Sequence, residues 1–406
     1  MSRRRLAVVH YTVPPVLGGV EAIVGEQARR LRARGHDVRI IAGRGDADVV
    51  RLADSRHPRI EALAQSLAAG ASPVDEFSGL KAEIARQLAP RLADRDCVVA
   101  HNVLTMPFNL PLAAALVEAG PPVVAWTHDL AWVNPRYAAF QGPSPLLRPL
   151  RAPQPRTTYV AISRVRQEEI TATLGLDPGQ VPVVPNGIDA QEFWGIRAAT
   201  RRVLRRVGVM DGSGPVVLVP VRVTQRKRLE LAVTATAALR ATYPELRTIV
   251  TGPLGPHDAA NRAYAHRLQQ LRSSLGLNGA VHFLFEAAEG GRHPVTAAMV
   301  AELYRLADVV LLPSESEGFG LPVLEAALSR APIVTADLPV LREVAGGGLY
   351  TFPREADGEA VAATVLRALS SPASRLRRRT LKRHDWPAVI EATERILPPP
   401  LEALPG

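Results

Sequence analysis

The chain has 406 residues, more than a single hydrophobic core usually contains, so its length predicts two domains. Apolar residues make up 47% of the sequence, and no apolar run reaches the roughly 18 residues that span a bilayer. The formal net charge of +10 raises nucleic acid and an anionic membrane face as partners. The arginines behind it are scattered along helical patterns, with little aromatic interleaving and no zinc-finger spacing. We therefore interpret the charge as a solvated surface and expect no nucleic-acid partner.

The N-terminus and the cysteine content are used to predict the cellular compartment of the protein. Basic residues precede a short apolar run that leads directly into a strand pattern, so we interpret this end as mature protein and not as a signal peptide. The one cysteine, Cys97, has no partner for an internal disulfide and is expected to be a buried small hydrophobe. We expect a cytoplasmic protein, with peripheral contact to the inner face of a membrane left open and the oligomeric state undetermined.

Strand-like apolar runs alternate with helical patterns along the chain, which predicts two doubly wound α/β domains in succession. The runs of the first series are Leu6–His10, Val38–Ala42, Val98–His101, Val123–Thr127, Tyr159–Ile162 and Val181–Val184. Those of the second series are Val216–Val221, Thr248–Thr251, Val281–Phe285, Asp308–Leu312 and Ile333–Thr335. A linker is expected near residues 190–213, and a short amphipathic helix over Trp386–Leu397.

The most specific motif is Glu317-Gly318-Phe319-Gly320-Leu321-Pro322, which follows a buried strand pattern and precedes a helix with a second acid, Glu325. A strand, a glycine-bearing loop and a helix N-terminus together predict an anion site suited to phosphate. The spacing of the two acids fits the two ends of one extended ligand. Our hypothesis is a sugar nucleotide, with Glu325 accepting ribose hydroxyls and Glu317 contacting the sugar. On local evidence alone, a solvated loop acid and an acid complementing the helix dipole remain the alternative.

With this motif the sequence resembles the retaining, nucleotide-sugar-dependent glycosyltransferases of the group 1, or family 4, class, from about residue 6 to about residue 390. The E-x7-E signature of that class corresponds to Glu317 and Glu325. The resemblance implies the α/β GT-B fold, in which two Rossmann-like domains face a central cleft and a C-terminal helix returns to the first domain. We accordingly expect an acceptor-side domain over 1–195, a nucleotide-sugar domain over 196–385, and the returning helix and tail over 386–406.

Basic residues follow the first strand pattern of the second series. Arg222 and Lys227 are placed to neutralise a diphosphate from two sides, although solvated basic residues before a helix are the local alternative. The class pattern here is Gly-Arg-Leu-x-x-x-Lys-Gly. Val221 replaces its first glycine and Arg228 its last, which makes Arg228 a second candidate for the phosphates. Gly252 ends the next strand pattern, in a loop that flanks the nucleotide base in relatives.

The first domain offers further candidates. Gly18-Gly19 before Glu21 resembles the GG-x-E turn of the class, while an ordinary strand-to-helix turn explains it equally well. It is not G-x-G-x-x-G, which weakens a reading as an NAD site. His101-Asn102 and His128-Asp129 end two strand patterns, where ligands of open α/β sheets gather. The resemblance places His128 at the donor or acceptor site, whereas a strand-end histidine alone is usually structural. Acceptor specificity is expected in residues 44–97 and in the loop at Asn134–Arg156.

The expected reaction moves a hexosyl group from a GDP- or UDP-linked sugar to a hydroxyl of a saccharide, lipid or small molecule, with retention. The candidate catalytic residues are Glu317, His128, Arg222 and Lys227. The candidate donor-binding residues are Gly18, Gly19, Arg222, Lys227, Arg228, Gly252, Gly318, Phe319, Gly320, Leu321 and Glu325. The candidate acceptor-side residues are Glu21, His101, Asn102 and Asp129. Cationic side chains and loop amides would stabilise the departing diphosphate, so we expect neither a metal nor a cofactor.

Three other functions remain open at this point. A glycoside hydrolase would use two carboxylates but would need neither the basic pair nor the phosphate-type loops. A sugar-nucleotide epimerase on the same scaffold would act on the donor with no acceptor present. A non-catalytic protein that binds nucleotide sugars or nucleic acid would bind without turnover.

Overall fold

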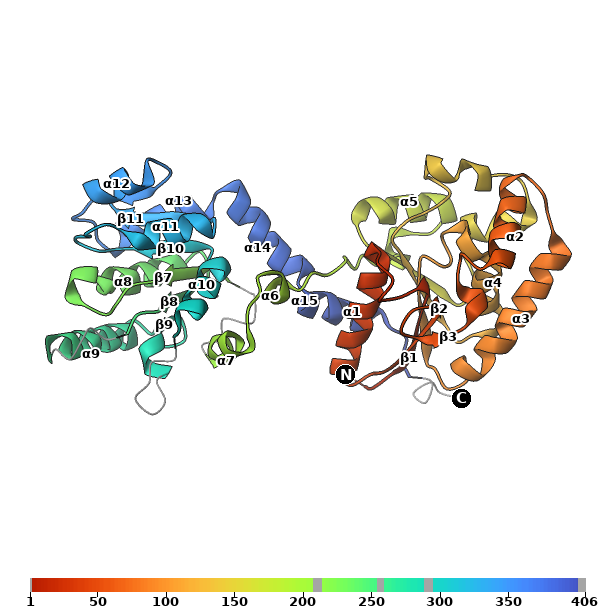
Figure 1. Cartoon of the computed structure of the whole chain (residues 1–406), viewed down its shortest axis with the longest axis horizontal. Coiled ribbons are helices and arrows are strands. Elements are labelled where there is room, and N and C mark those ends of the chain that lie inside the picture. The colour runs from red at the N-terminus through yellow and green to blue at the C-terminus, as the bar shows by residue number, and fades with distance from the viewer. Residues whose placement is uncertain (1, 207–213, 254–258, 288–294, 401–406) are drawn as a thin grey trace. The chain divides into compact units, whose positions relative to one another are not determined.

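The computed structural model describes residues 2–206, 214–253, 259–287 and 295–400. The chain divides into two compact units, residues 1–187 with 386–406 and residues 188–385 (Figure 1). The division falls earlier than the expected boundary after residue 195, because the segment that follows Gly187 packs on the second unit. There Ile196 joins the second unit's core and the Trp194 carbonyl accepts a hydrogen bond from Arg305 Nε at 2.7 Å. No helix of the described residues is both long and apolar enough to cross a bilayer.

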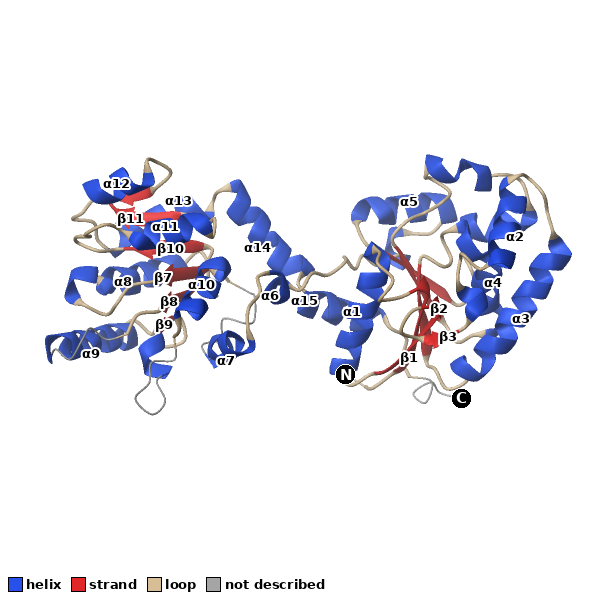
Figure 2. Cartoon of the chain, viewed as in Figure 1, coloured by secondary structure: helices blue, strands red, loops and turns tan. Residues whose placement is uncertain are grey.

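The first unit contains a parallel six-stranded sheet in the order β3-β2-β1-β4-β5-β6. Helices lie around its strands, which Figure 2 draws in red. Its strands are β1 (Arg5–Thr12), β2 (Asp37–Arg44), β3 (Asp48–Val49), β4 (Cys97–His101), β5 (Val123–Thr127) and β6 (Thr157–Ala161). Its helices are α1 (Gly19–Ala33), α2 (Pro58–Ala68), α3 (Val74–Leu92), α4 (Leu110–Ala119), α5 (Arg164–Leu174) and α15 (Trp386–Ile396), with short 3-10 turns η2 (Pro107–Asn109) and η3 (Pro135–Phe140).

Alternate residues of the central strands fill two separate cores, because successive side chains of a strand point to opposite faces of the sheet. In β1, Ala7 and Val9 belong to the core that α2, α3, α4 and α5 cover, while Leu6 and Val8 belong to the core beneath α1 and α15. Both faces are therefore buried, which explains why β1 reads as an uninterrupted apolar run.

The C-terminal helix α15 belongs to the first unit, as the resemblance implied. Trp386, at its start, is 2% exposed and packs so closely over Gly187 that a Cβ there would lie 2.5 Å from the indole ring. Near its end, Glu394 accepts hydrogen bonds from Arg34 at 2.8 Å and is 3.1 Å from the His36 ring nitrogen, which joins α15 to the end of α1.

The second unit repeats the architecture with the strand order β12-β11-β10-β7-β8-β9, all parallel. Its strands are β7 (Val216–Val219), β8 (Arg247–Val250), β9 (Val281–Phe283), β10 (Val309–Leu312), β11 (Ile333–Ala336) and β12 (Tyr350–Phe352). Its helices are α6 (Ala190–Phe193), α7 (Ala198–Arg206), α8 (Leu229–Arg240), α9 (Ala259–Ser274), α10 (Ala297–Leu306), α11 (Leu321–Leu328), α12 (Pro339–Ala345), α13 (Gly358–Leu369) and α14 (Pro372–His384), with the 3-10 turn η6 (Gln225–Lys227).

The sequence predicted all but two of the strands, with one false assignment. The run Val181–Val184 forms a single bridge, from Val183 to Ala161, because Pro182 and Pro185 interrupt it and lack the N–H that a ladder requires. The very short β3 and β12 were not predicted. The expected linker contains α6 and α7, and its last part, 207–213, lies outside the described residues.

Each sheet has one position at which the chain reverses its direction of winding. In the first sheet β1 lies between β2 and β4, and in the second β7 lies between β8 and β10. Ligands of open parallel sheets bind beyond the carboxyl ends of the strands at such switch points. The switch points are thus the places to look for functional residues, after β1 and β4 in one unit and after β7 and β10 in the other.

Candidate active site

The loop of residues 313–320, which contains Glu317 and which we call the signature loop, connects β10 to α11. Gly320 caps the helix with φ +99°, a left-handed conformation, and a Cβ on it would lie 2.4 Å from Leu341 Cδ2. Only glycine fits that position without strain. Gly318 differs, because its φ is not positive and a Cβ on it would meet no described atom within 4 Å. The apolar side chains of Phe319 and Leu321 are exposed beside it, 54% and 62% respectively.

The loop after β7 is joined to this signature loop by three hydrogen bonds and one longer ion pair. Lys227 Nζ donates a hydrogen bond to Glu317 Oε1 at 2.5 Å, and both side chains are largely buried, 12% and 9% exposed. Arg226 Nη1 donates to the Ser316 carbonyl at 2.5 Å and lies 3.8 Å from Glu317 Oε2. The Glu315 amide donates to the Arg226 carbonyl at 2.9 Å. The loop after β7 and the signature loop are therefore bonded to each other at the switch point of the second sheet.

Two other predicted residues of the loop after β7 are placed differently from Lys227. Arg222 is exposed, and its side chain makes no hydrogen bond or ion pair with any described residue, although its carbonyl accepts a hydrogen bond from the Thr224 amide at 3.0 Å. Arg228 has a left-handed φ of +46°, and its guanidinium donates to the carbonyls of Arg354 and Ala356. The glycine that the family pattern has here is explained by this conformation, and the phosphate role of Arg228 stays a prediction.

Gly252 supports the same loop from the end of β8. A Cβ on it would lie 2.0 Å from the Val221 carbonyl oxygen and 2.5 Å from Arg222 Cα. Neither backbone atom is free to move aside, so the close approach of these two strand ends requires glycine. Its structural role is thus evident, while its contact with a nucleotide stays a prediction.

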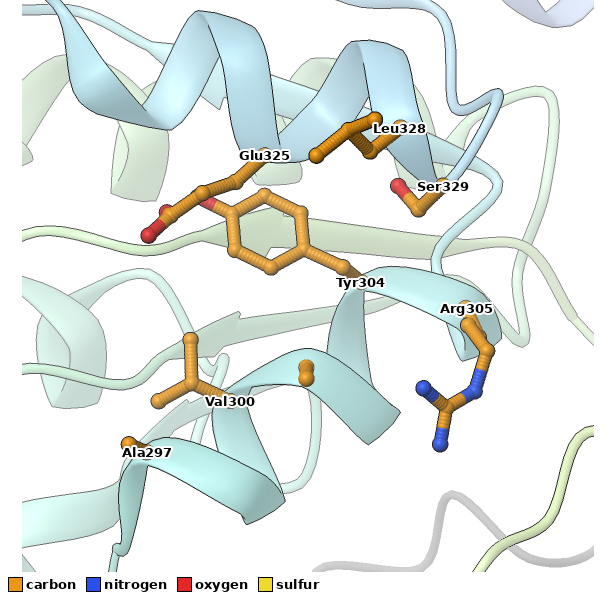
Figure 3. A pocket seen from close by; sticks show the side chains of 8 residues that line it. Ala297, Val300, Tyr304, Arg305, Glu325, Leu328 and Ser329 are labelled. Carbon is orange, nitrogen blue, oxygen red and sulfur yellow. The ribbon is translucent and has the colours of Figure 1, made fainter.

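Glu325 lies on α11 and its carboxylate meets a phenol from α10. Tyr304, only 3% exposed, donates its hydroxyl to Glu325 Oε2 at 2.6 Å. Burial, followed by the hydrogen bond and the negative charge of Glu325, raises the pKa of Tyr304. The two side chains line a cavity of about 260 Å³ whose other walls include Ala297, Val300 and Leu328 (Figure 3). Tyr304 therefore fixes one carboxylate oxygen.

The first unit holds a polar cavity of about 420 Å³ at its own switch point. We call it the polar cavity; its walls come from the ends of β1 and β2, from the start of α1, and from the segments that follow β1, β2, β4 and β5. It is lined by His10, Tyr11, Thr12, Val16, Leu17, Val20, Glu21, Arg44, Ser55, Arg56, Asn102, Met106, Phe108, Asp129 and Tyr137. Three of the four predicted acceptor-side residues, Glu21, Asn102 and Asp129, thus share one cavity.

Local hydrogen bonds hold those three residues. Thr12 Oγ1 donates to Glu21 Oε1 at 2.8 Å. Asn102 has a left-handed φ of +57°, and its Oδ1 accepts from the amides of His128 at 2.8 Å and Asp129 at 3.0 Å. The end of β4 is thereby fastened to the end of β5. Gly18 is the extended N-cap of α1, and a Cβ on it would overlap the Glu21 carboxylate, whereas Gly19 has open space around it.

His101 and His128 do not line the polar cavity; they form a buried chain of ring hydrogen bonds. His101 Nε2 lies 3.0 Å from Gln27 Oε1, and His101 Nδ1 lies 3.1 Å from His128 Nε2. His128 Nδ1 lies 3.3 Å from Asn186 Nδ2. One tautomer set satisfies every contact: Asn186 donates to His128, His128 Nε2–H donates to His101 Nδ1, and His101 Nε2–H donates to Gln27.

That tautomer set requires both rings to be neutral. Burial lowers the pKa of His128 to about 3 and that of His101 well below its usual value, with neighbouring histidines adding to the effect. His10, which does line the polar cavity and lies 2.7 Å from the His101 carbonyl, also has a lowered pKa, again chiefly through burial. His128 and His101 therefore act as neutral hydrogen-bonding groups, and their predicted ligand contacts would require a rearrangement.

The structure adds residues that the sequence reasoning did not identify. Arg226 contacts both Ser316 and Glu317, Tyr304 holds Glu325, and Arg44 and Arg56 bring positive charge to the polar cavity. Of these, only Arg226 carried a local signal, since it lies inside the basic run after β7. The contacts of the others arise from elements far apart in the chain.

Two family models match the chain and together cover most of both units. The model described as Glycosyl transferases group 1 matches residues 200–384, and the model described as Glycosyltransferase Family 4 matches residues 17–192. The D-inositol 3-phosphate glycosyltransferase of Actinosynnema mirum is 30% identical over 391 residues, 87% of this chain and 87% of that protein. The chain belongs to the group 1 glycosyltransferases. Its two parallel six-stranded sheets are accordingly those of the GT-B fold.

Other relatives carry the same description. The D-inositol 3-phosphate glycosyltransferase of Kineococcus radiotolerans is 31% identical over 340 residues, 80% of this chain and 74% of the relative. Among solved structures, Anabaena HepE in complex with UDP-glucose is 18% identical, with a TM-score of 0.36, over 97% of this chain and 99% of that chain. The two predicted motifs after β7 and β10 lie within the first of the two matched models, and the Gly18-Gly19 turn before Glu21 lies within the second.

Proposed function

We propose that this glycosyltransferase moves a hexosyl group from a nucleotide diphosphate sugar to an acceptor hydroxyl, with retention and without a metal ion. The observation that carries the proposal is the contact between Lys227 and Glu317 at 2.5 Å. It brings a cation from the loop after β7 and a carboxylate from the loop after β10 to the switch point of one sheet. A diphosphate attached to a sugar needs both kinds of partner at neighbouring positions.

The chemistry of this site follows from where charge develops. As the sugar leaves, negative charge grows on the diphosphate, and preorganised donors there lower the barrier most. Lys227 and Arg222 would supply cationic donors, and the amides after Glu317, at the start of α11, would supply neutral ones. The donor would displace Glu317 from Lys227, which frees the carboxylate to accept sugar hydroxyls. In this proposal the cations and amides take the part that a metal has in other enzymes.

Glu325 would hold the ribose. Its Oε2 is already occupied by the Tyr304 hydroxyl at 2.6 Å, which orients the carboxylate and leaves Oε1 to accept from vicinal hydroxyls. The cavity beside this pair, about 260 Å³, offers room for part of the nucleoside. Tyr304 is thus a positioning residue in this proposal.

The polar cavity of the first unit would take the acceptor. Carboxylates, an amide and hydroxyls line it, and these are the partners that a hydroxyl-rich ring requires. The relatives are named for D-inositol 3-phosphate, a ring of this chemistry with an anionic substituent. Arg44 and Arg56 would supply positive charge for such a substituent.

Binding of donors to variants of the second unit tests the proposal. Isothermal titration with UDP-, GDP- and ADP-sugars should identify one donor that binds the parent. Charge-assisted hydrogen bonds contribute about 1.5–3 kcal/mol, so Glu325→Ala and Lys227→Ala should each weaken that donor about ten- to hundredfold. Tyr304→Phe should fall between the parent and Glu325→Ala.

Two substitutions serve as matched controls. Glu359, exposed in the first turn of α13, controls for loss of a helical carboxylate, and Glu315, exposed in the signature loop, controls for loss of a loop carboxylate. Glu359→Ala and Glu315→Gln should bind donor like the parent. If Glu325→Ala and Lys227→Ala also bind like the parent, the assignment of the donor site is wrong.

A further inference from the structure

The polar cavity adjoins a second cavity of about 460 Å³ in the same unit. Ser55, Arg56 and Phe108 line both. The second cavity, which we call the side cavity, is formed by α2, by the 3-10 turns η2 and η3, and by the residues just before α2. A ligand that fills the polar cavity therefore has a second space directly beside it.

The side cavity has a different chemistry from its neighbour. Its walls include two aromatic rings, Phe108 and Phe140, and the small side chains Ala64 and Ala68, one helical turn apart on α2. Glu61 and Gln65 add polar groups from the same helix. The small alanine side chains of α2 leave space beside the two phenylalanine rings. The faces of aromatic rings favour ligand groups that are flat and apolar.

The Phe108 ring, which lines both cavities, is held in place by neighbouring aromatic rings. The Phe108 ring packs edge-on against Tyr11, with centroids 5.8 Å apart, and edge-on against Tyr137, with centroids 5.5 Å apart. Tyr11, itself 4% exposed, donates its hydroxyl to the Asn102 carbonyl at 3.1 Å. The aromatic wall is thus tied to the end of β4, so the side cavity is preorganised and not formed by a freely moving side chain.

We propose that the acceptor has two parts: a hydroxyl-rich ring in the polar cavity, which carries the attacking hydroxyl, and a second ring with an apolar face in the side cavity. This inference rests on the proposed function and specifies its acceptor. The second ring is either a further sugar, whose C–H face stacks on an aromatic side chain, or an aryl group. Residues of α2 and of the turn that contains Phe140 set the preference, in the two regions where the sequence predicted acceptor specificity.

Filling the side cavity tests this assignment. Transfer from the bound nucleotide sugar is measured with methyl glycosides, phenyl glycosides and disaccharides of glucose, galactose and mannose. The parent should use a two-ring acceptor with a kcat/KM at least tenfold above that of the matching methyl glycoside. Ala64→Phe and Ala68→Phe should each remove most of that advantage while leaving transfer to the methyl glycoside within about twofold. Ala62→Phe, on the exposed face of α2, should keep it.

The possible outcomes distinguish failure of the two-part acceptor from failure of the proposed glycosyl transfer. A preference for phenyl glycosides alone, or for disaccharides alone, identifies the second ring. If the parent uses methyl and two-ring glycosides equally, or if both filling variants retain the advantage, the side cavity is not an acceptor site although the glycosyl transfer stands. If the parent transfers to no acceptor from any donor, the proposed function fails and the two-part acceptor fails with it.

Discussion

Buried imidazoles that carry no charge join the ends of β4 and β5. His101 and His128 are each hydrogen-bonded at both ring nitrogens, and burial holds their pKa values low, about 3 for His128. We expect NMR spectra of histidine-labelled protein to show both rings in the neutral form from pH 8 down to pH 5. A ring of this pair that protonates near pH 6.5 would contradict the tautomer assignment.

The lowered pKa of His128 also makes the stability of the first unit depend on pH. The folded-state pKa of His128, about 3, lies below the unfolded value of 6.5, so the unfolded chain binds more protons and stability falls as pH falls below 6.5. Between pH 7 and pH 5 this one group should cost about 2 kcal/mol of unfolding free energy. Urea titrations at the two pH values measure it, with His128→Gln as the control that should lose that part of the change. Equal stability at both pH values would contradict the account.

The two glycines of the signature loop should respond differently to alanine. Gly320→Ala forces a Cβ into Leu341 at a left-handed φ and should lower the melting temperature of the second unit. Gly318→Ala meets only open space and should leave the melting temperature unchanged. If the backbone at Gly318 approaches the diphosphate, the same substitution should weaken donor binding at least tenfold. Unchanged donor binding by Gly318→Ala would show that the ligand does not approach there.

At the scale of elements, the turn into α8 carries a strained residue. Arg228 adopts φ +46° and ψ +48°, the left-handed region that costs a residue with a side chain about 1 kcal/mol. Arg228→Ala keeps this cost and removes the hydrogen bonds to the Arg354 and Ala356 carbonyls, whereas Arg228→Gly removes both. The glycine variant should therefore be about 1 kcal/mol more stable than the alanine variant in chemical denaturation. Equal stability of the two would mean that the turn relaxes in the variants.

The strands that the sequence predicted most clearly are those with an uninterrupted run of apolar residues. β1 and β10 are apolar on both faces because helices cover both sides of each sheet, so their runs stand out. The run at Val181–Val184 is similarly rich in valine, but Pro182 within it and Pro185 after it leave it a single bridge. The two-residue β3 falls below the length at which alternation can be recognised.

The candidate site was predictable where glycines and charges gather in one loop. Glu317 was predicted to contact the sugar and Lys227 the diphosphate of one donor, and the structure brings the two side chains into contact. Tyr304 and Phe108 gave no such signal, because a phenol in a helix or a phenylalanine after a strand is ordinary until packing supplies its neighbour. His128 was predicted from the resemblance to face a ligand, yet the structure hydrogen-bonds it to His101 and Asn186.

At the scale of the whole molecule, the C-terminal helix α15 completes the core of the first unit. Trp386 fills the space between Gly187 and α1. Trp386→Ala should cost the first unit about 3–5 kcal/mol, the usual range for removing a buried large aromatic side chain. Hydrogen exchange should accelerate in β1 and α1 while β7 and β8 remain as in the parent. Equal acceleration in both units would contradict the assignment of α15 to the first.

In the proposed function, each unit would supply a different part of the reaction. The second unit presents cations, amides and carboxylates after β7 and β10, and the first presents the polar cavity that we propose as the acceptor site. Both sets lie at the switch point of their own sheet. Under the proposed function, one sheet would bind the donor and the other the acceptor.

Proton NMR of a reaction with donor and acceptor tests whether the enzyme transfers the sugar with retention. We predict that nucleoside diphosphate appears together with a new glycosidic anomeric signal whose configuration matches that of the donor sugar. We also predict that Lys227→Ala slows this transfer at least tenfold, because the departing diphosphate loses its cation. Release of diphosphate with an inverted anomeric signal, or transfer by Lys227→Ala at the rate of the parent, would contradict the proposal.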